Sequence, residues 1–155
     1  SAAIATGSNL EYGNTYAIRS VYGSDLAVSY WNTGYANLSD TPDLDWVKQR
    51  FAEYDRFYEF VYKDFYLLTP YSFLPDCFCA WQFHDPETGK GAVLVFRRSE
   101  CVEESITLKL YGLKNDGEYV FEDADTQKTQ VLKGDELTVT LSEKNSGCLL
   151  FYETV

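Results

Sequence analysis

The feature that most constrains this fold is a change of hydrophobic period near residue 65. From there on, polar and apolar residues alternate with period two, in short runs separated by turns rich in Gly, Asn and Asp. The runs are CFCAWQFHD, AVLVFRR, ESITLKLYGL, EYVFED, TQVL, ELTVTL and GCLLFYE. Short alternating strands joined by short turns are typical of antiparallel sheets. The sequence therefore predicts a mainly β protein, with an antiparallel β-sandwich of Greek-key type over residues 66–155.

The alternation also predicts which side chains share a face. In the first run, one face carries Cys77, Cys79, Trp81 and Phe83, and the other carries Phe78, Ala80, Gln82 and His84. In the later runs the predicted inward residues are Ile106, Leu108, Leu110, Leu137, Val139 and Leu141.

A long helix is predicted before the strands. Thr41 suits the N-cap and Pro42 suits the first helical turn. The predicted buried stripe is Val47, Phe51, Tyr54, Tyr58 and Val61, which are spaced at helical intervals, and it is widened by Trp46 and Phe57. Earlier still, Leu26–Trp31 is short and almost wholly apolar, which predicts a strand covered on both faces.

Residues 63–72, KDFYLLTPYS, join these two parts and show neither a helical nor a strand period. We place a boundary here, between a segment 1–62 and the strands of 66–155. The chain has no Met, so we expect that Ser1 is not a translation start.

The net charge of −11 argues against nucleic acid and anionic membranes as partners, because both attract Lys and Arg clusters. No apolar run approaches the ~20 residues that span a bilayer. The four cysteines, Cys77, Cys79, Cys101 and Cys148, are predicted to be free thiols, which favours a reducing, cytoplasmic compartment. We predict neither a metal nor a cofactor.

Catalytic motifs are scarce. His84 is the single histidine, and it is predicted to be a turn residue rather than a catalyst, since no G-x-S-x-G elbow accompanies it. Asp123 and Asp125 are predicted to be solvated surface, and the pair Arg97–Arg98 is predicted to form an edge salt bridge. Trp81 is predicted to be core rather than a sugar platform. No residue is assigned a catalytic role.

Three stretches carry a resemblance to a known family. DFYLLTPYS, then AWQFHDPETGKGAVLVFRR, then a Gly-Leu pair before a turn and EYVFEDADT resemble the C-terminal region of bacterial α-galactosidases of glycoside hydrolase family 36. Leu67 stands where that family usually has proline. The resemblance implies that residues 1–62 are the closing strand and helix of a (β/α)8 barrel. It also implies that residues 65–68 are buried between the barrel helix and the sandwich.

The resemblance also implies a function. The chain would be a structural accessory domain of a retaining glycosidase, inert alone, because the two catalytic aspartates of such enzymes lie on barrel strands that would precede Ser1. Arg19 and Trp31 would be substrate-binding residues at the active-site end of the closing segment, where Trp31 would wall the sugar pocket and Arg19 would hydrogen-bond a sugar hydroxyl or hold a carboxylate. The alternative is that Trp31 only packs and that Arg19 forms a surface ion pair. The partners would be the rest of the barrel, an α-galactoside-type carbohydrate, and another copy of the chain through residues 1–62.

Two alternatives stay open. One is a carbohydrate-binding module, and the other is a plain protein-interaction domain. Two or more exposed, roughly coplanar Trp or Tyr rings on one face would favour the module.

Overall fold

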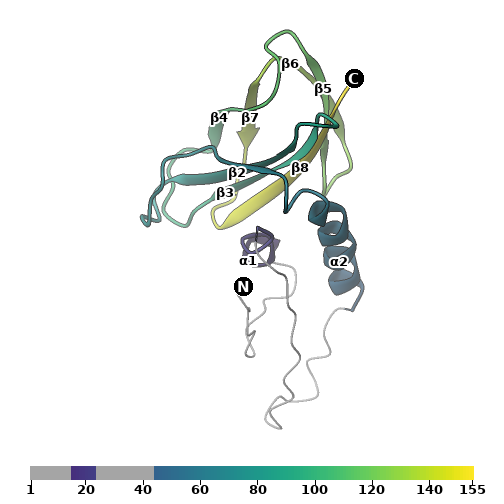
Figure 1. Cartoon of the computed structure of the whole chain (residues 1–155). Helices are drawn as coiled ribbons and strands as arrows, with labels where there is room; N and C mark the ends of the chain where they lie inside the picture. The colour runs from purple at the N-terminus through teal and green to yellow at the C-terminus, as the bar shows by residue number, and fades with distance from the viewer. Residues whose placement is uncertain (1–14, 24–43) are drawn as a thin grey trace.

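The computed structural model describes residues 15–23 and 44–155 of the chain (Figure 1). Its elements are α1 (Thr15–Arg19), α2 (Leu44–Tyr58), β1 (Asp64–Leu67), β2 (Phe78–Asp85), β3 (Lys90–Arg97), β4 (Ser105–Lys109), β5 (Glu118–Asp123), β6 (Thr129–Lys133), β7 (Glu136–Thr140) and β8 (Ser146–Thr154). Six strands form one sheet in the order β1-β2-β3-β8-β5-β6, and β4 and β7 form a second, two-stranded sheet. Every strand pair is antiparallel.

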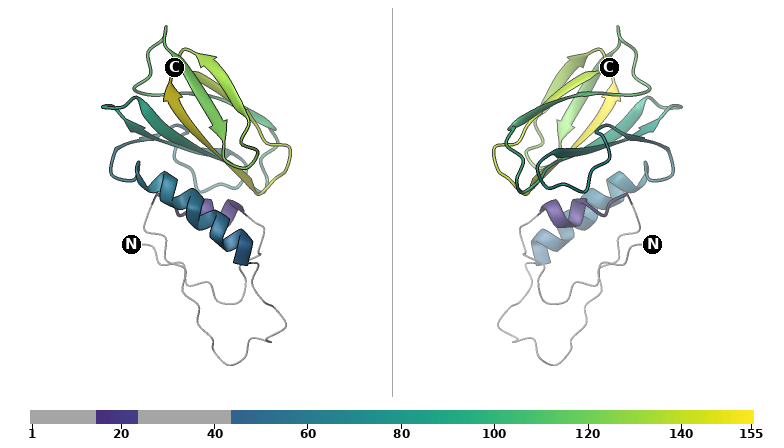
Figure 2. Two further views of the ribbon diagram at one scale, coloured as in Figure 1. Left: turned by 90° about the vertical axis from the view of Figure 1, so that its right-hand side faces the viewer. Right: turned by 90° about the vertical axis from the view of Figure 1, so that its left-hand side faces the viewer.

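The six-stranded sheet is covered on both faces. α1 and α2 lie against one face (Figure 2), and the β4–β7 pair packs against the other through a shared apolar cluster. The strand β3 shows the consequence most clearly. Ala92 and Leu94 contact the helix side, Val93 and Val95 contact the β4–β7 side, and all four are fully buried. A strand with cover on both sides reads as a continuous apolar run, which explains AVLVF.

The predicted strands are confirmed in position and in facing. Cys79, Trp81 and Phe83 of β2 belong to the helix-side cluster, whereas Phe78 and Ala80 belong to the opposite one. The inward residues predicted for the β4 and β7 runs all belong to, or pack against, the β4–β7 cluster. The chain is thus mainly β and antiparallel.

The connector differs from the prediction, because its first part forms the edge strand β1. Asp64–Leu67 pairs with β2, and Leu68 extends the ladder by donating its backbone N–H to the Ala80 carbonyl. Phe65 packs against Phe83 at 5.2 Å between ring centroids. Burial of the whole stretch 65–68 was wrong for this structure, since Phe65 and Leu67 are exposed. An edge strand with one neighbour leaves such side chains uncovered.

α2 also differs from the prediction. It has 15 residues, so a long helix is not supported. Tyr54 and Phe57 are buried as predicted, but Phe51 and Tyr58 of the predicted stripe are exposed. Arg50 and Glu53, which were not predicted to be buried, lie on the buried side. The predicted stripe is therefore rotated from the true one, because two charged residues take up the face that turns toward the sheet.

Nothing in the described residues supports a barrel remnant. Residues 15–23 contribute the five-residue helix α1 and a turn. The predicted strand Leu26–Trp31 and the predicted cap residues Thr41 and Pro42 lie outside the described residues.

Candidate functional site

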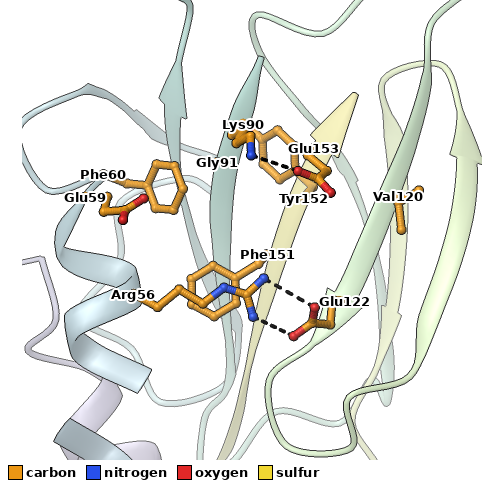
Figure 3. Close-up of a pocket in the computed structure, with 10 residues that line it drawn as sticks. All are labelled: Arg56, Glu59, Phe60, Lys90, Gly91, Val120, Glu122, Phe151, Tyr152 and Glu153. Carbon is orange, nitrogen blue, oxygen red and sulfur yellow. Dashed lines mark hydrogen bonds and ion pairs between the residues drawn. The ribbon is translucent and has the colours of Figure 1, made fainter. Parts of the chain in front are cut away.

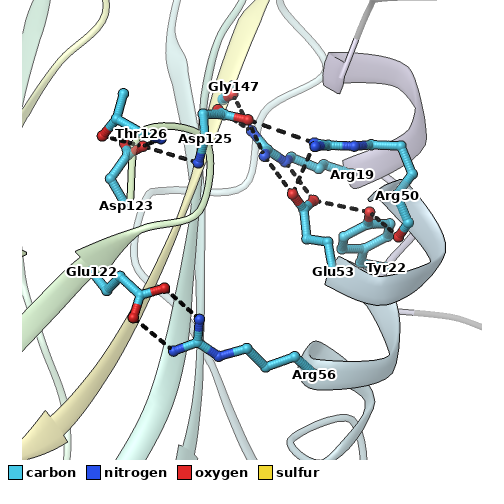
Figure 4. Close-up of polar contacts among 10 residues, drawn as sticks. All are labelled: Arg19, Tyr22, Arg50, Glu53, Arg56, Glu122, Asp123, Asp125, Thr126 and Gly147. Carbon is cyan, nitrogen blue, oxygen red and sulfur yellow. Dashed lines mark hydrogen bonds and ion pairs between the residues drawn. The ribbon is translucent and has the colours of Figure 1, made fainter. Parts of the chain in front are cut away.

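A buried cluster of charges lies where α1, α2 and the turn after β5 meet (Figure 4). Arg19, at the end of α1, is its centre and has no exposed surface. Its Nε and Nη2 donate to the two carboxylate oxygens of Glu53 at 2.8 and 2.7 Å. Its Nη1 and Nη2 donate to those of Asp125, at 2.8 and 2.7 Å, and Nη1 also donates to the Gly147 carbonyl at 3.0 Å. All five N–H donors of the guanidinium are therefore used within the chain.

The neighbours of Glu53 complete the cluster. The Tyr22 hydroxyl donates to Glu53 Oε1 at 2.9 Å. Arg50 Nη1 lies 2.8 Å from Glu53 Oε2 and 3.5 Å from Asp125 Oδ1. Despite these short ion-pair distances, Arg50 Nη1 and Nε lack a hydrogen-bond partner, because the carboxylates are not in line with the N–H groups. Two arginines and two carboxylates leave the cluster with no net charge.

The electrostatics keep these groups in their usual charge states. Burial alone lowers the pKa of Arg19, but hydrogen bonds and attraction from Glu53 and Asp125 outweigh it and raise that pKa. Burial raises the pKa of Tyr22, and the Glu53 charge raises it further. Burial raises the pKa of Asp125, but its contacts with Arg19 outweigh this effect and lower it. The pKa values of Arg19, Tyr22 and Asp125 are all shifted away from neutral pH, so the geometry suits a structural joint rather than catalysis.

The structure describes only one of the two predicted site residues, Arg19. Trp31 lies outside the described residues, so the structure does not bring it together with Arg19. Arg19 was predicted either to hydrogen-bond a sugar hydroxyl or to hold a carboxylate. In this structure it holds two carboxylates, and a hydroxyl would have to displace one of them. Substrate binding by Arg19 and Trp31 stays a prediction.

Asp125 is the member of this cluster that sequence reasoning treated as solvated surface. Its side chain is partly exposed, yet it makes a bidentate contact with a residue 106 positions earlier. Asp123 shapes the turn, because its Oδ1 accepts from the backbone N–H groups of Asp125 and Thr126. The ADT sequence after a strand signals such a turn, but not its distant partner.

A second polar cluster lies inside the β4–β7 side of the core. Gln82 Nε2 donates to the Tyr152 hydroxyl and to the Tyr111 carbonyl, both at 2.8 Å, and His84 Nδ1 lies 2.9 Å from the same hydroxyl. His84 is buried within β2 rather than in the turn after it, which corrects the prediction. Burial lowers the pKa of His84, although Asp64 and Asp85 oppose this effect.

The pair Arg97–Arg98 was predicted to form an edge salt bridge, and Arg97 Nη1 does lie 3.9 Å from Glu104 Oε1, but β3 is a central strand and most contacts of the pair are to backbone carbonyls. Arg97 is buried and donates to the backbone carbonyls of Leu141, Ser142, Cys101 and Val102. Arg98 donates to the carbonyls of Ser72 and Leu74. Both guanidinium groups hold loops against the end of β3. Each one donates hydrogen bonds to several loop carbonyls that are not paired within a sheet.

A pocket of about 150 Å³ opens between α2 and the sheet (Figure 3). Its two cations are already paired, since Arg56 contacts Glu122 at 2.5 Å and Lys90 contacts Glu153 at 2.9 Å. Arg56 also covers the ring of Phe151, 3.9 Å from its centroid. The pocket is smaller than the ~300–1,000 Å³ of typical ligand sites, and it offers neither a free cation nor an open ring.

Within the part of the chain that the structure describes, two contacting pairs of exposed or partly exposed tyrosine rings do not meet the criterion for a carbohydrate-binding module. Tyr58 and Tyr62 are nearly perpendicular, at 89°. Tyr66 and Tyr111 are nearly parallel, at 18°, but their centroids lie 5.0 Å apart, so each covers a face of the other. Neither pair forms a flat platform for a sugar.

The remaining chemistry is limited. Cys77, Cys79, Cys101 and Cys148 are free, as predicted. Within residues 15–23 and 44–155, no three His, Cys, Asp or Glu side chains lie close enough to hold a metal ion. In the same part of the chain, no helix has the length and apolar character needed to cross a membrane.

The structure is similar to the crystal structure of the GH36 α-galactosidase AgaA from Geobacillus stearothermophilus in complex with raffinose. The TM-score is 0.55 and the sequence identity is 20%. The match covers 77% of this chain and 17% of that chain, so this chain spans a small part of that enzyme's length. No protein-family model matches the sequence, and no curated protein matches it. The likeness shows a GH36-like fold.

Proposed function

We propose that this chain is a structural accessory domain of a GH36-like retaining glycosidase, and that it is inert alone. It would follow a catalytic barrel, with residues 66–155 as a closed C-terminal β-sandwich and residues 1–62 as the closing part of the barrel. The likeness to part of an α-galactosidase supports this proposal. The free thiols support a reducing, cytoplasmic location.

The observation that carries the proposal is that α2 has two apolar faces. One face, with Tyr54 and Phe57, is buried against the sheet. Another carries Phe51 and Tyr58, both more than 40% exposed. A helix that is apolar on more than one side is typical of a layer between two packed parts. The charge cluster around Arg19 holds this helix rigidly on the sheet, which suits a joint between domains.

The first test is an assay of the purified chain with aryl α-galactosides. We expect no turnover above the blank, because no stretch of the sequence resembles either of the family's catalytic aspartate motifs. Turnover that survives repurification would refute the proposal. The second test uses the complete product of the reading frame that encodes this chain. We expect its complete product to hydrolyse the same substrates and to contain a barrel before this segment.

The third test concerns α2. In the complete product, Phe51→Ser should lower the melting temperature, because it removes an apolar contact with the barrel, while Lys48→Ser on the same helix should not. In this chain alone, Phe51→Ser should have a small effect, since the side chain is partly exposed. Equal effects of Phe51→Ser in both proteins would count against a barrel contact.

A further inference from the structure

The loop between β1 and β2 carries large apolar side chains on its outside. Tyr71 is 74% exposed, Phe73 is 82% exposed and Leu74 is 61% exposed. We call these three side chains the apolar tip. The rings of Tyr71 and Phe73 contact each other edge to face, at 4.9 Å between centroids.

The backbone beneath the apolar tip is fixed. Arg98 Nη1 donates to the Ser72 carbonyl at 2.9 Å and also to the Leu74 carbonyl. The Leu74 N–H donates to the Ser72 hydroxyl at 3.0 Å, and the Glu100 N–H donates to the Pro75 carbonyl at 2.9 Å. Because the backbone of this loop is already ordered, the loop loses less conformational entropy when its exposed side chains bind a partner.

The surroundings of the apolar tip are acidic. The Glu100–Pro75 bond brings the loop after β3 beside it, and that loop exposes Val102 together with Glu100, Glu103 and Glu104. Asp76 is exposed on the tip's own loop. Two cationic side chains lie nearby, Arg97 and Arg98, and both already donate hydrogen bonds to backbone carbonyls.

We propose that the apolar tip inserts into an apolar socket with a basic rim on the catalytic domain of the same polypeptide. The inference rests on the proposed function and adds a second contact area to it. The acidic surroundings favour a basic counterpart. They oppose an anionic membrane, and they oppose the same face of a second copy, because like charges would meet across a two-fold axis.

Oxidative footprinting of side chains, read by mass spectrometry, tests this contact directly. The two samples are this chain, at a concentration at which light scattering shows a monomer, and the complete product of the reading frame. We expect Tyr71 and Phe73 to react rapidly in the chain and roughly fivefold or more slowly in the complete product, as for side chains at the dry centre of an interface. Val131, which is exposed on β6 at the opposite edge of the sheet, should react equally in both.

Each outcome has one meaning. If Phe51 and Tyr58 of α2 are protected but Tyr71 and Phe73 are not, the proposed function stands and the apolar-tip contact is wrong. If none of the four is protected, both proposals are wrong. If protection of Tyr71 and Phe73 disappears on dilution, the contact lies between copies and the proposed socket is refuted.

Under the proposal, Glu100→Lys weakens the protection of Tyr71 and Phe73, and the control variant Glu136→Lys on β7 does not.

Discussion

Two arginines contact carboxylates in opposite surroundings, and they show what burial adds to an ion pair. Arg19 is fully buried, whereas the side chain of Arg56 is 48% exposed where it meets Glu122. Arg19→Met should lower the free energy of unfolding by about 3–5 kcal/mol, because Glu53 and Asp125 would lose their shared bidentate partner and Glu53 would keep only Arg50 and Tyr22 in a buried site. Arg56→Met should cost about 1 kcal/mol or less. Urea unfolding at pH 7 measures both.

The double variant Arg19→Met, Glu53→Leu is the control for this comparison. It removes both charges, so it should recover part of the stability that Arg19→Met loses. Similar losses for Arg19→Met and Arg56→Met would mean that the buried cluster is not the joint described above.

His84 should make stability depend on pH. Its pKa is lowered in the folded protein, so below its ordinary value near 6.5 the unfolded chain binds the proton more readily. Stability should fall as the pH drops below about 6.5 and be unaffected by this group above it. His84→Gln should therefore lose less stability between pH 7.5 and pH 5.5 than the parent, as measured by urea midpoints. Identical pH dependence in both proteins would contradict the buried position of the imidazole.

Single residues also show why the site could not be read from the sequence. Arg19 reaches Glu53 across 34 positions and Asp125 across 106. Neither carboxylate has a local signal that separates it from the other acidic residues of the chain. Gln82, by contrast, was correctly placed on the same face as Phe78 and Ala80 by alternation alone, although its partners Tyr111 and Tyr152 were not predicted.

At the scale of elements, the strands were predictable because period two reports burial on one face directly. β4 and β7 follow this pattern most clearly, β3 and β8 are continuous apolar runs, and most of the turns between strands contain Gly, Asn or Asp. β1 was missed because an edge strand of four residues, with apolar side chains on both faces, shows no alternation. The stripe of α2 was misplaced because Arg50 and Glu53 are buried by pairing, which hydrophobic spacing does not register.

The loop after β4 offers a test of packing between elements. Gly112 has φ +75°, and a Cβ there would lie 2.5 Å from Cδ2 of His84. Gly112→Ala should combine backbone strain of about 1–2 kcal/mol with an overpacking cost of about 1–3 kcal/mol. Gly134, at φ +93° and with its closest contact at 3.3 Å, is the matched control. Gly134→Ala should show the strain alone, and equal losses in urea unfolding would exclude a close fit between the loop and His84.

At the scale of the whole molecule, the GH36-like fold agrees with the resemblance of the connector and the β2–β3 hairpin. The fold class, mainly β and antiparallel, was predicted correctly from the sequence, because most of the core residues lie on strands. It could not give the two-sided cover of the six-stranded sheet. That cover depends on α1 and α2 meeting the sheet through contacts between distant segments, such as Tyr22 with Phe57 and Phe57 with Phe83.

The outward face of α2 leads to a prediction about the isolated chain. Phe51 and Tyr58 are partly exposed there, and exposed apolar faces tend to associate. The chain alone should therefore form a homodimer through residues 1–62 as its concentration rises, as light scattering can measure. Phe51→Ser should raise the dissociation constant about tenfold or more, if it removes a central apolar contact. Val131→Ser, which removes an exposed apolar side chain at the opposite edge of the sheet, should leave it unchanged. A strict monomer at high concentration would show that α2 needs no partner, and it would weaken the case that this face contacts a barrel.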